Sequence, residues 1–125
     1  MTPCELLICA EDAMVNSYSP YSGFSVGAAL ITAGGRVYKG CNIENSAFSP
    51  TICAERTAFF KAISEGENDF EAIAIVGKYK NGEYKHLCYP CGVCRQVMKE
   101  FCGGDFKIIL GDGKGEYAVS YTHLR

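Results

Sequence analysis

Three features are missing from this 125-residue sequence: an excess of basic residues, a long apolar segment and an internal repeat. Lys and Arg number 12 against 14 Asp and Glu, so the formal net charge is −2. This charge offers no electrostatic footprint for nucleic acid or for an anionic membrane. No apolar run approaches the roughly 20 residues that cross a bilayer. The first residues, from Met1 to Glu5, lack the basic segment of a secretory signal, so we expect a cytoplasmic protein.

The chain also lacks any stretch rich in Gly, Pro or Ser that would divide it into separate domains. Hydrophobic residues make up 48% of the sequence and charged residues 21%. These fractions are typical of a soluble globular chain and argue against disorder. We therefore expect a single domain over residues 1–125.

Hydrophobic periodicity predicts helices that alternate with strands. A first helix begins at Pro3, because Thr2 and Glu5 form a capping box around its first turn. The alternation predicts an α/β fold, specifically a three-layer α/β/α sandwich with a mixed sheet of about five strands. The predicted helices cover residues 3–17, 51–65 and 91–101, and the predicted strands cover 26–32, 36–42, 70–76, 106–110 and 117–122.

Eight cysteines are many for a chain without a secretory signal, where clustered thiols indicate metal or redox chemistry. Cys91 and Cys94 follow Pro90 at the predicted start of a helix, so their thiols share one helical face. Alone, this pair is compatible with half of a structural zinc site, a redox dithiol or two small core residues. Cys88 precedes Cys91 by three residues and offers an alternative pair, but Pro90 leaves Cys88 in extended chain and favours Cys94.

Cys53 offers a third thiol near the predicted start of the second helix. A crossover connection places the starts of the second and third helices at the same end of adjacent strands, so a site of three cysteines is expected there. Three protein ligands leave zinc a fourth position for water, which is typical of a catalytic site. Glu55 has the carboxylate to move protons beside such a site, and Arg56 has a guanidinium to hydrogen-bond to a cysteine sulfur.

Four segments together resemble the small homotetrameric zinc-dependent cytidine deaminases. They are SPYSGFSVGAA at 19–29, GCNIEN at 40–45, TICAERTA at 51–58 and PCGVCRQV at 90–97. The spacing of cysteines and glutamate in the last two is the general signature of zinc nucleobase deaminases. The resemblance extends from about Leu6 to Tyr117.

The resemblance implies a role for each matching residue. Cys53, Cys91 and Cys94 would bind one zinc ion, with Arg56 supporting the ligands, and Glu55 would be the catalytic proton shuttle. Glu55 would take a proton from the attacking water and deliver protons to N3 of cytosine and to the leaving amine. The implied reaction converts cytidine and deoxycytidine to uridine and deoxyuridine in pyrimidine salvage. Asn42 and Glu44 would hold the ribose hydroxyls and Phe24 would pack against the pyrimidine. Ala54 would also contact the substrate.

Other interpretations remain open from the sequence. Without the resemblance, Asn42 and Glu44 are ordinary turn residues and Phe24 is an ordinary core residue. The chain could deaminate another cytosine compound, such as a blasticidin-type antibiotic, or it could be a structural zinc module or a dithiol oxidoreductase. A nucleic-acid editor is disfavoured, because the basic groove that grips a phosphate backbone is missing. Residues 118–125 depart from the family pattern and indicate an atypical, truncated tail that would weaken substrate closure and the tetramer.

Overall fold

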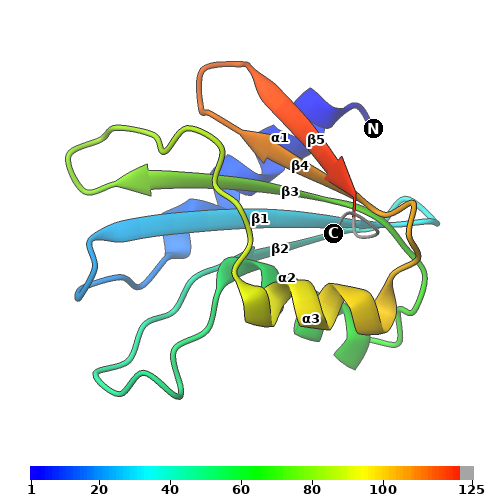
Figure 1. The fold of residues 1–125 in the computed structure, drawn as a ribbon, viewed down its shortest axis with the longest axis horizontal. Coiled ribbons are helices and arrows are strands. Elements are labelled where there is room, and N and C mark those ends of the chain that lie inside the picture. Colours follow the sequence, from blue (N-terminus) through cyan, green and yellow to red (C-terminus); the bar gives the residue numbers. More distant parts are fainter. Residues whose placement is uncertain (122–125) are drawn as a thin grey trace.

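The computed structural model describes residues 1–121, and its central feature is one mixed five-stranded sheet. The strands lie in the order β2-β1-β3-β4-β5, and only β3 and β4 run parallel to each other (Figure 1). The elements are α1 (Pro3–Ala13), the short 3-10 helix η1 (Met14–Asn16), β1 (Phe24–Thr32), β2 (Val37–Cys41), α2 (Ala54–Ser64), β3 (Phe70–Tyr79), α3 (Gly92–Phe101), β4 (Lys107–Gly111) and β5 (Tyr117–Tyr121). The predicted last strand is present up to Tyr121, whereas residues 122–125 of the predicted atypical tail lie outside the described residues.

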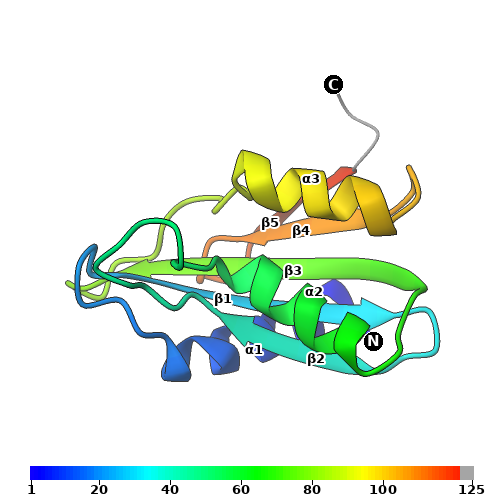
Figure 2. The same ribbon diagram turned by 90° about the horizontal axis from the view of Figure 1, so that it is seen from below.

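Helices cover both faces of the sheet, which confirms the predicted three-layer arrangement. Helix α1 lies against one face, and α2 and α3 lie side by side against the other (Figures 1 and 2). Successive side chains of a strand point to opposite faces. Ala28 and Leu30 of β1 therefore pack under α2 and α3, while Ala29 and Ile31 pack under α1. Among the described residues, no helix is long and apolar enough to span a bilayer.

The larger core lies under α2 and α3 and is centred on aromatic side chains. Phe59 of α2 is fully buried and contacts the rings of Phe70 and Phe106, with centroids 5.2 Å and 5.9 Å away. Burying a side chain of this size stabilises the fold by about 1.5–3 kcal/mol. These contacts join α2 to β3 and to the start of β4, so the beginning of α2 is held at a fixed position over the sheet.

The first helix begins as predicted but ends earlier. Thr2 caps α1 and forms the expected reciprocal capping box with Glu5. The α-helix stops at Ala13, a 3-10 turn follows, and the backbone becomes extended at Ser17. Extension at this point lets Tyr18 pair with the chain after β2, where its N–H donates to the carbonyl of Asn42. A long-range backbone contact therefore overrides the helical periodicity beyond Ala13.

Helices α2 and α3 each begin one or more residues later than predicted. Ile52 exchanges two backbone hydrogen bonds with Ile43, so the chain stays extended up to Cys53, which caps α2 with φ −79° and ψ 156°. Cys91 caps α3 in a similar conformation, with φ −73° and ψ 171°. The expectation of adjacent preceding strands was wrong, because β1 lies between β2 and β3. The two helix starts nevertheless meet on the same side of the sheet.

Candidate active site

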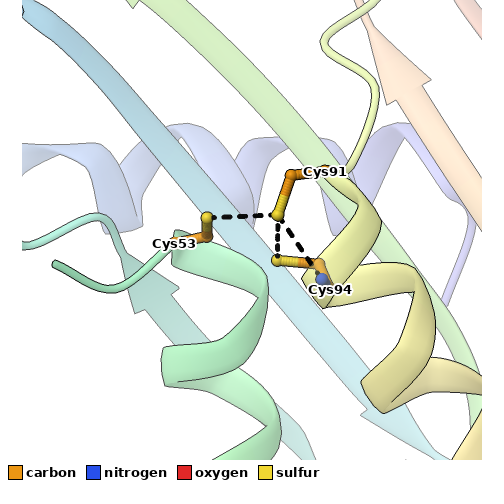
Figure 3. Close-up of side chains that lie close together, drawn as sticks. All are labelled: Cys53, Cys91 and Cys94. Atoms are coloured by element: carbon orange, nitrogen blue, oxygen red, sulfur yellow. Dashed lines mark hydrogen bonds between the residues drawn. The ribbon is translucent and has the colours of Figure 1, made fainter. Parts of the chain in front are cut away.

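Three cysteine sulfurs meet where α2 and α3 begin. Cys53 and Cys91 cap the two helices, and Cys94 is the third residue of α3 (Figure 3). The Sγ atom of Cys91 lies 3.6 Å from that of Cys53 and 3.3 Å from that of Cys94. Both helix starts carry partial positive charge, which favours thiolates at this position. The sequence-predicted trio is therefore a single cluster in space.

The cluster fits a zinc ion by donor type and by spacing. Thiolates are soft ligands that zinc prefers. A tetrahedral zinc with Zn–S bonds of about 2.3 Å needs sulfurs about 3.8 Å apart, and the three sulfurs all lie within 4.8 Å of one another. Within residues 1–121, no other group of three or more His, Cys, Asp or Glu side chains is arranged so that it could bind a metal ion. Cys53, Cys91 and Cys94 could hold the zinc, and three protein ligands leave one of its four coordination positions for another group.

Arg56 adds positive charge on the Cys53 side of the cluster. Its Nη2 atom donates a hydrogen bond to Cys53 Sγ at 3.4 Å. The pKa of Cys53 is lowered to about 5, first by the hydrogen bond from the Cys94 thiol and then by that from Arg56. The pKa of Cys94 is raised by that same hydrogen bond and by its burial. These contacts therefore favour the thiolate form of Cys53 over that of Cys94.

Glu55 places a buried carboxyl group beside the sulfurs. It is the second residue of α2, it is only 4% exposed, and it interacts with both Cys53 and Cys94. Burial raises the pKa of Glu55 to about 7, because a carboxylate loses its hydration there. A carboxyl group with a pKa near neutrality can both accept and release a proton. The geometry therefore combines a metal-binding cluster with a proton-transfer group.

Asn42 follows β2 and is held by three hydrogen bonds. Its Oδ1 atom accepts from the Val26 N–H at 2.9 Å and from the Ser17 hydroxyl, and its Nδ2 atom donates to the Phe24 carbonyl at 2.8 Å. The backbone partners fix which way the amide points, since an N–H can only donate and a carbonyl can only accept. These bonds use both lone pairs of Oδ1 and one of the two hydrogens on Nδ2. The second Nδ2 hydrogen remains for another partner.

Glu44 is held from the turn that precedes β1. Its Oε1 atom accepts from the N–H groups of Tyr21 and Ser22 at 3.0 Å and 3.1 Å, and its Oε2 atom accepts from the Ser22 hydroxyl. The Ser22 hydrogen bond is the main cause that lowers the pKa of Glu44. The carboxylate therefore keeps its charge and retains acceptor capacity on Oε2.

Phe24 and Ala54, the other two predicted substrate contacts, are both packed against other parts of the protein. The Phe24 ring packs against Tyr79 with centroids 4.9 Å apart, and it lies so close to Gly77 that a Cβ there would be 2.5 Å from the ring. Ala54 is fully buried and is the first residue of α2. Its backbone N–H has no partner within the helix, so this is the group that could bind a ligand.

Cys88, the alternative member of the cysteine pair, lies outside the cluster. It is buried, and burial raises the pKa of its thiol to about 12. Its sulfur lies close to Gly77, where a Cβ atom would be 3.0 Å from it and 2.5 Å from the Phe24 ring. A thiol in this apolar position resists the ionisation that metal binding requires. The structure thus groups Cys91 with Cys94 rather than with Cys88.

Sequence reasoning missed Ser17 and Ser22, which hold Asn42 and Glu44. Each serine lies more than 20 residues from its partner in the sequence. No local pattern connects them, and their contacts arise only because the segment after α1 pairs with the segment after β2.

The fold and the site together define a zinc-dependent hydrolase of the deaminase class. The family model for the cytidine and deoxycytidylate deaminase zinc-binding region matches residues 2–110. The chain belongs to this family.

Individual relatives agree with this assignment. A cytidine deaminase from Sporosarcina psychrophila is 48% identical over 112 residues, which cover 90% of this chain and 79% of the relative. A blasticidin-S deaminase from Bacillus cereus is 33% identical over 92 residues, which cover 71% of this chain and 66% of the relative. A crystal structure of cytidine deaminase from Burkholderia pseudomallei superposes with a TM-score of 0.89 at 40% identity, covering 98% of this chain and 94% of that one.

Proposed function

We propose that this enzyme hydrolyses cytidine and deoxycytidine to uridine and deoxyuridine, releasing ammonia, with one zinc ion bound by Cys53, Cys91 and Cys94. The observation that carries the proposal is the buried Glu55 carboxyl group beside three sulfurs at two helix starts. When bound, zinc would supply the Lewis acidity that makes water a nucleophile near neutral pH. The proposed role of Arg56 is to support the ligands through its hydrogen bond to Cys53.

The protons of the reaction would pass through Glu55. The carboxylate takes one proton from the attacking water and gives it to N3 of the cytosine ring. It then carries the second proton of that water to the exocyclic amine, which leaves as ammonia while C4 becomes a carbonyl. Burial supports this role, because a pKa near 7 lets one group alternate between base and acid.

Asn42 and Glu44 are proposed to bind a sugar hydroxyl. Once their internal hydrogen bonds are counted, Asn42 offers one N–H and Glu44 offers a lone pair on Oε2. One hydroxyl satisfies both, since it accepts from the amide and donates to the carboxylate. The pair therefore supports recognition of a single hydroxyl, and we expect both ribose and deoxyribose substrates to be accepted. Phe24 would pack against the pyrimidine, and the Ala54 N–H would bind it from the start of α2.

The cellular setting of this activity is part of the proposal. We propose a single-domain, cytoplasmic enzyme of pyrimidine salvage that assembles as a homotetramer. Exposed aromatic side chains support assembly: Phe48 is 92% exposed, and Phe60 and Phe101 lie partly exposed on α2 and α3. Sedimentation velocity of the zinc-loaded protein tests the assembly, and a monomer at micromolar concentration would overturn that part of the proposal.

The proposed reaction is tested by metal analysis together with an assay of ammonia release from cytidine. We expect about one zinc per chain and turnover of cytidine and deoxycytidine. Glu55→Gln should keep the zinc but lose turnover by a factor of about a thousand or more. Retained turnover in this variant would remove Glu55 from its proposed role.

A blasticidin-type antibiotic is the alternative substrate, because the chain is 33% identical to a blasticidin-S deaminase. Including blasticidin S in the same assay decides between the two. A higher kcat/KM for the antibiotic than for cytidine would favour the alternative.

A further inference from the structure

The turn at residues 19–23 is attached to Glu44 by three hydrogen bonds. Two come from the backbone N–H groups of Tyr21 and Ser22, and both end on Oε1. The third comes from the Ser22 hydroxyl and ends on Oε2. Within residues 1–121, the Ser22 hydroxyl is therefore the only group that donates a hydrogen bond to Oε2 of Glu44.

The Ser22 hydroxyl also contacts the strand that begins at Phe24. Its oxygen accepts from the Phe24 N–H at 3.0 Å, while its one hydrogen is donated to Glu44. One hydroxyl therefore connects the residue proposed to pack on the pyrimidine with the residue proposed to bind the sugar. Ser22 is itself exposed, so this connection is not a by-product of core packing.

Rotation of the carboxylate is what these contacts can control. The terminal torsion of a glutamate side chain is broad, so hydrogen bonds to Oε1 alone hold the plane of the carboxylate only weakly. A donor on Oε2 fixes the plane and with it the direction of the remaining lone pair. A fixed lone pair lowers the ordering cost when a hydroxyl binds.

We infer that Ser22 is a positioning residue that fixes the Glu44 carboxylate in the orientation that receives a substrate hydroxyl. The inference rests on the proposed function, in which Glu44 binds the sugar. Ser22 touches no reacting atom. Its loss should therefore weaken the binding of substrate and product while leaving the chemical step unchanged.

The test compares Ser22→Ala with Ser22→Thr in the zinc-loaded enzyme. We expect Ser22→Ala to raise KM for cytidine by about fivefold to twentyfold, with kcat within about twofold of the parent. The Kd for uridine, measured by titration calorimetry, should rise by a similar factor. Ser22→Thr keeps the hydroxyl at an exposed position and should restore both values. Ser64→Ala is the matched control, because within residues 1–121 its exposed hydroxyl bonds only to the Lys61 carbonyl at the end of α2.

A double variant separates positioning from a general effect on the turn. In a Glu44→Ala background, Ser22→Ala should cause no further rise in KM or in the uridine Kd. An equal rise in both backgrounds would overturn the inference, as would an unchanged KM in Ser22→Ala alone. Should Ser22→Ala fail to fold, Ser22→Cys tests the same point, because its thiol is a weaker donor and should raise KM by a smaller factor.

Failure of the proposed function gives a different result. A parent enzyme that neither deaminates cytidine nor binds uridine would overturn the proposed function and this inference together. A parent enzyme that deaminates cytidine with a KM insensitive to Ser22 would overturn this inference alone.

Discussion

Glu55 illustrates how a single residue can serve a reaction and oppose folding. The residue is only 4% exposed, and ionising its carboxyl group costs hydration that the neighbouring sulfurs do not replace. The same burial raises its pKa to about 7, where a proton-transfer group is most useful. Stability and proposed activity therefore make opposite demands on this side chain.

The cost can be measured on the zinc-free protein through its dependence on pH. The folded-state pKa of Glu55 lies above its ordinary value of 4.5, so the cost is absent below pH 4.5, grows as the pH rises, and is complete above pH 7. A rise from 4.5 to about 7 corresponds to at most about 3 kcal/mol. Glu55→Gln should therefore raise the free energy of unfolding by up to about 3 kcal/mol at pH 8 and by little at pH 5.

Urea denaturation at the two pH values, with a chelator present, measures this difference. The unchanged protein at each pH is the reference. An equal gain in stability at pH 5 and pH 8 would show that the ionisation of Glu55 is not its source.

The roles of some site residues can be predicted from the sequence, whereas those of others cannot. The trio of cysteines and Glu55 could be singled out because short spacings and a flanking proline mark two helix starts. Ser17 and Ser22 could not, since each acts on a partner more than 20 residues away. The resemblance names Asn42 and Glu44, but their internal hydrogen bonds depend on how distant segments meet in the fold. Local chemistry is readable from the sequence, whereas orientation by distant groups is not.

At the scale of elements, the beginning of α2 shows where sequence patterns mislead. The sequence predicts a helix over residues 51–65, yet the helix begins at Ala54. The reason is the backbone pairing of Ile43 with Ile52, which keeps the chain extended through Cys53. The five strands and three helices were all predicted, because their apolar patterns are local. Their ends were less accurate, because contacts between distant segments decide them.

Gly40 of β2 shows how tightly α2 is seated on the sheet. A Cβ atom at this position would lie 2.5 Å from the carbonyl oxygen of Ala54 and 2.6 Å from the amide nitrogen of Ala58. Both are backbone atoms of α2, so the whole helix would have to move. We expect Gly40→Ala to lower the free energy of unfolding by about 3 kcal/mol and to reduce zinc content, because Cys53 moves with α2.

Urea denaturation and metal analysis check this expectation. Gly34→Ala is the matched control, because a Cβ there meets only the Thr32 side-chain oxygen at 3.8 Å, an ordinary contact. Equal stability of the two variants would show that the sheet and α2 are less closely packed than described.

For the whole molecule, the cysteine cluster joins two parts of the chain that are held unequally. Five residues of α2 are buried, whereas only Cys94 and Met98 of α3 are buried. A zinc ion bound to Cys53 on one helix and to Cys91 and Cys94 on the other would cross-link them. Because an unfolded chain has no preformed site, the free energy of metal binding adds to the stability of the fold.

Removing zinc should therefore lower the melting temperature of the entire molecule. A ligand present at about a hundred times its Kd adds about 2.7 kcal/mol, which for a chain of this length corresponds to a decrease of about 10 °C on chelation. Scanning calorimetry with and without chelator measures the decrease, and metal analysis measures the zinc. Cys94→Ala should lose both the zinc and the chelator effect. Cys88→Ala removes a buried thiol of the same size, yet it should keep both, because that sulfur lies outside the cluster. The reverse result, with zinc lost only in Cys88→Ala, would mean that Cys88 and Cys91 form the ligand pair.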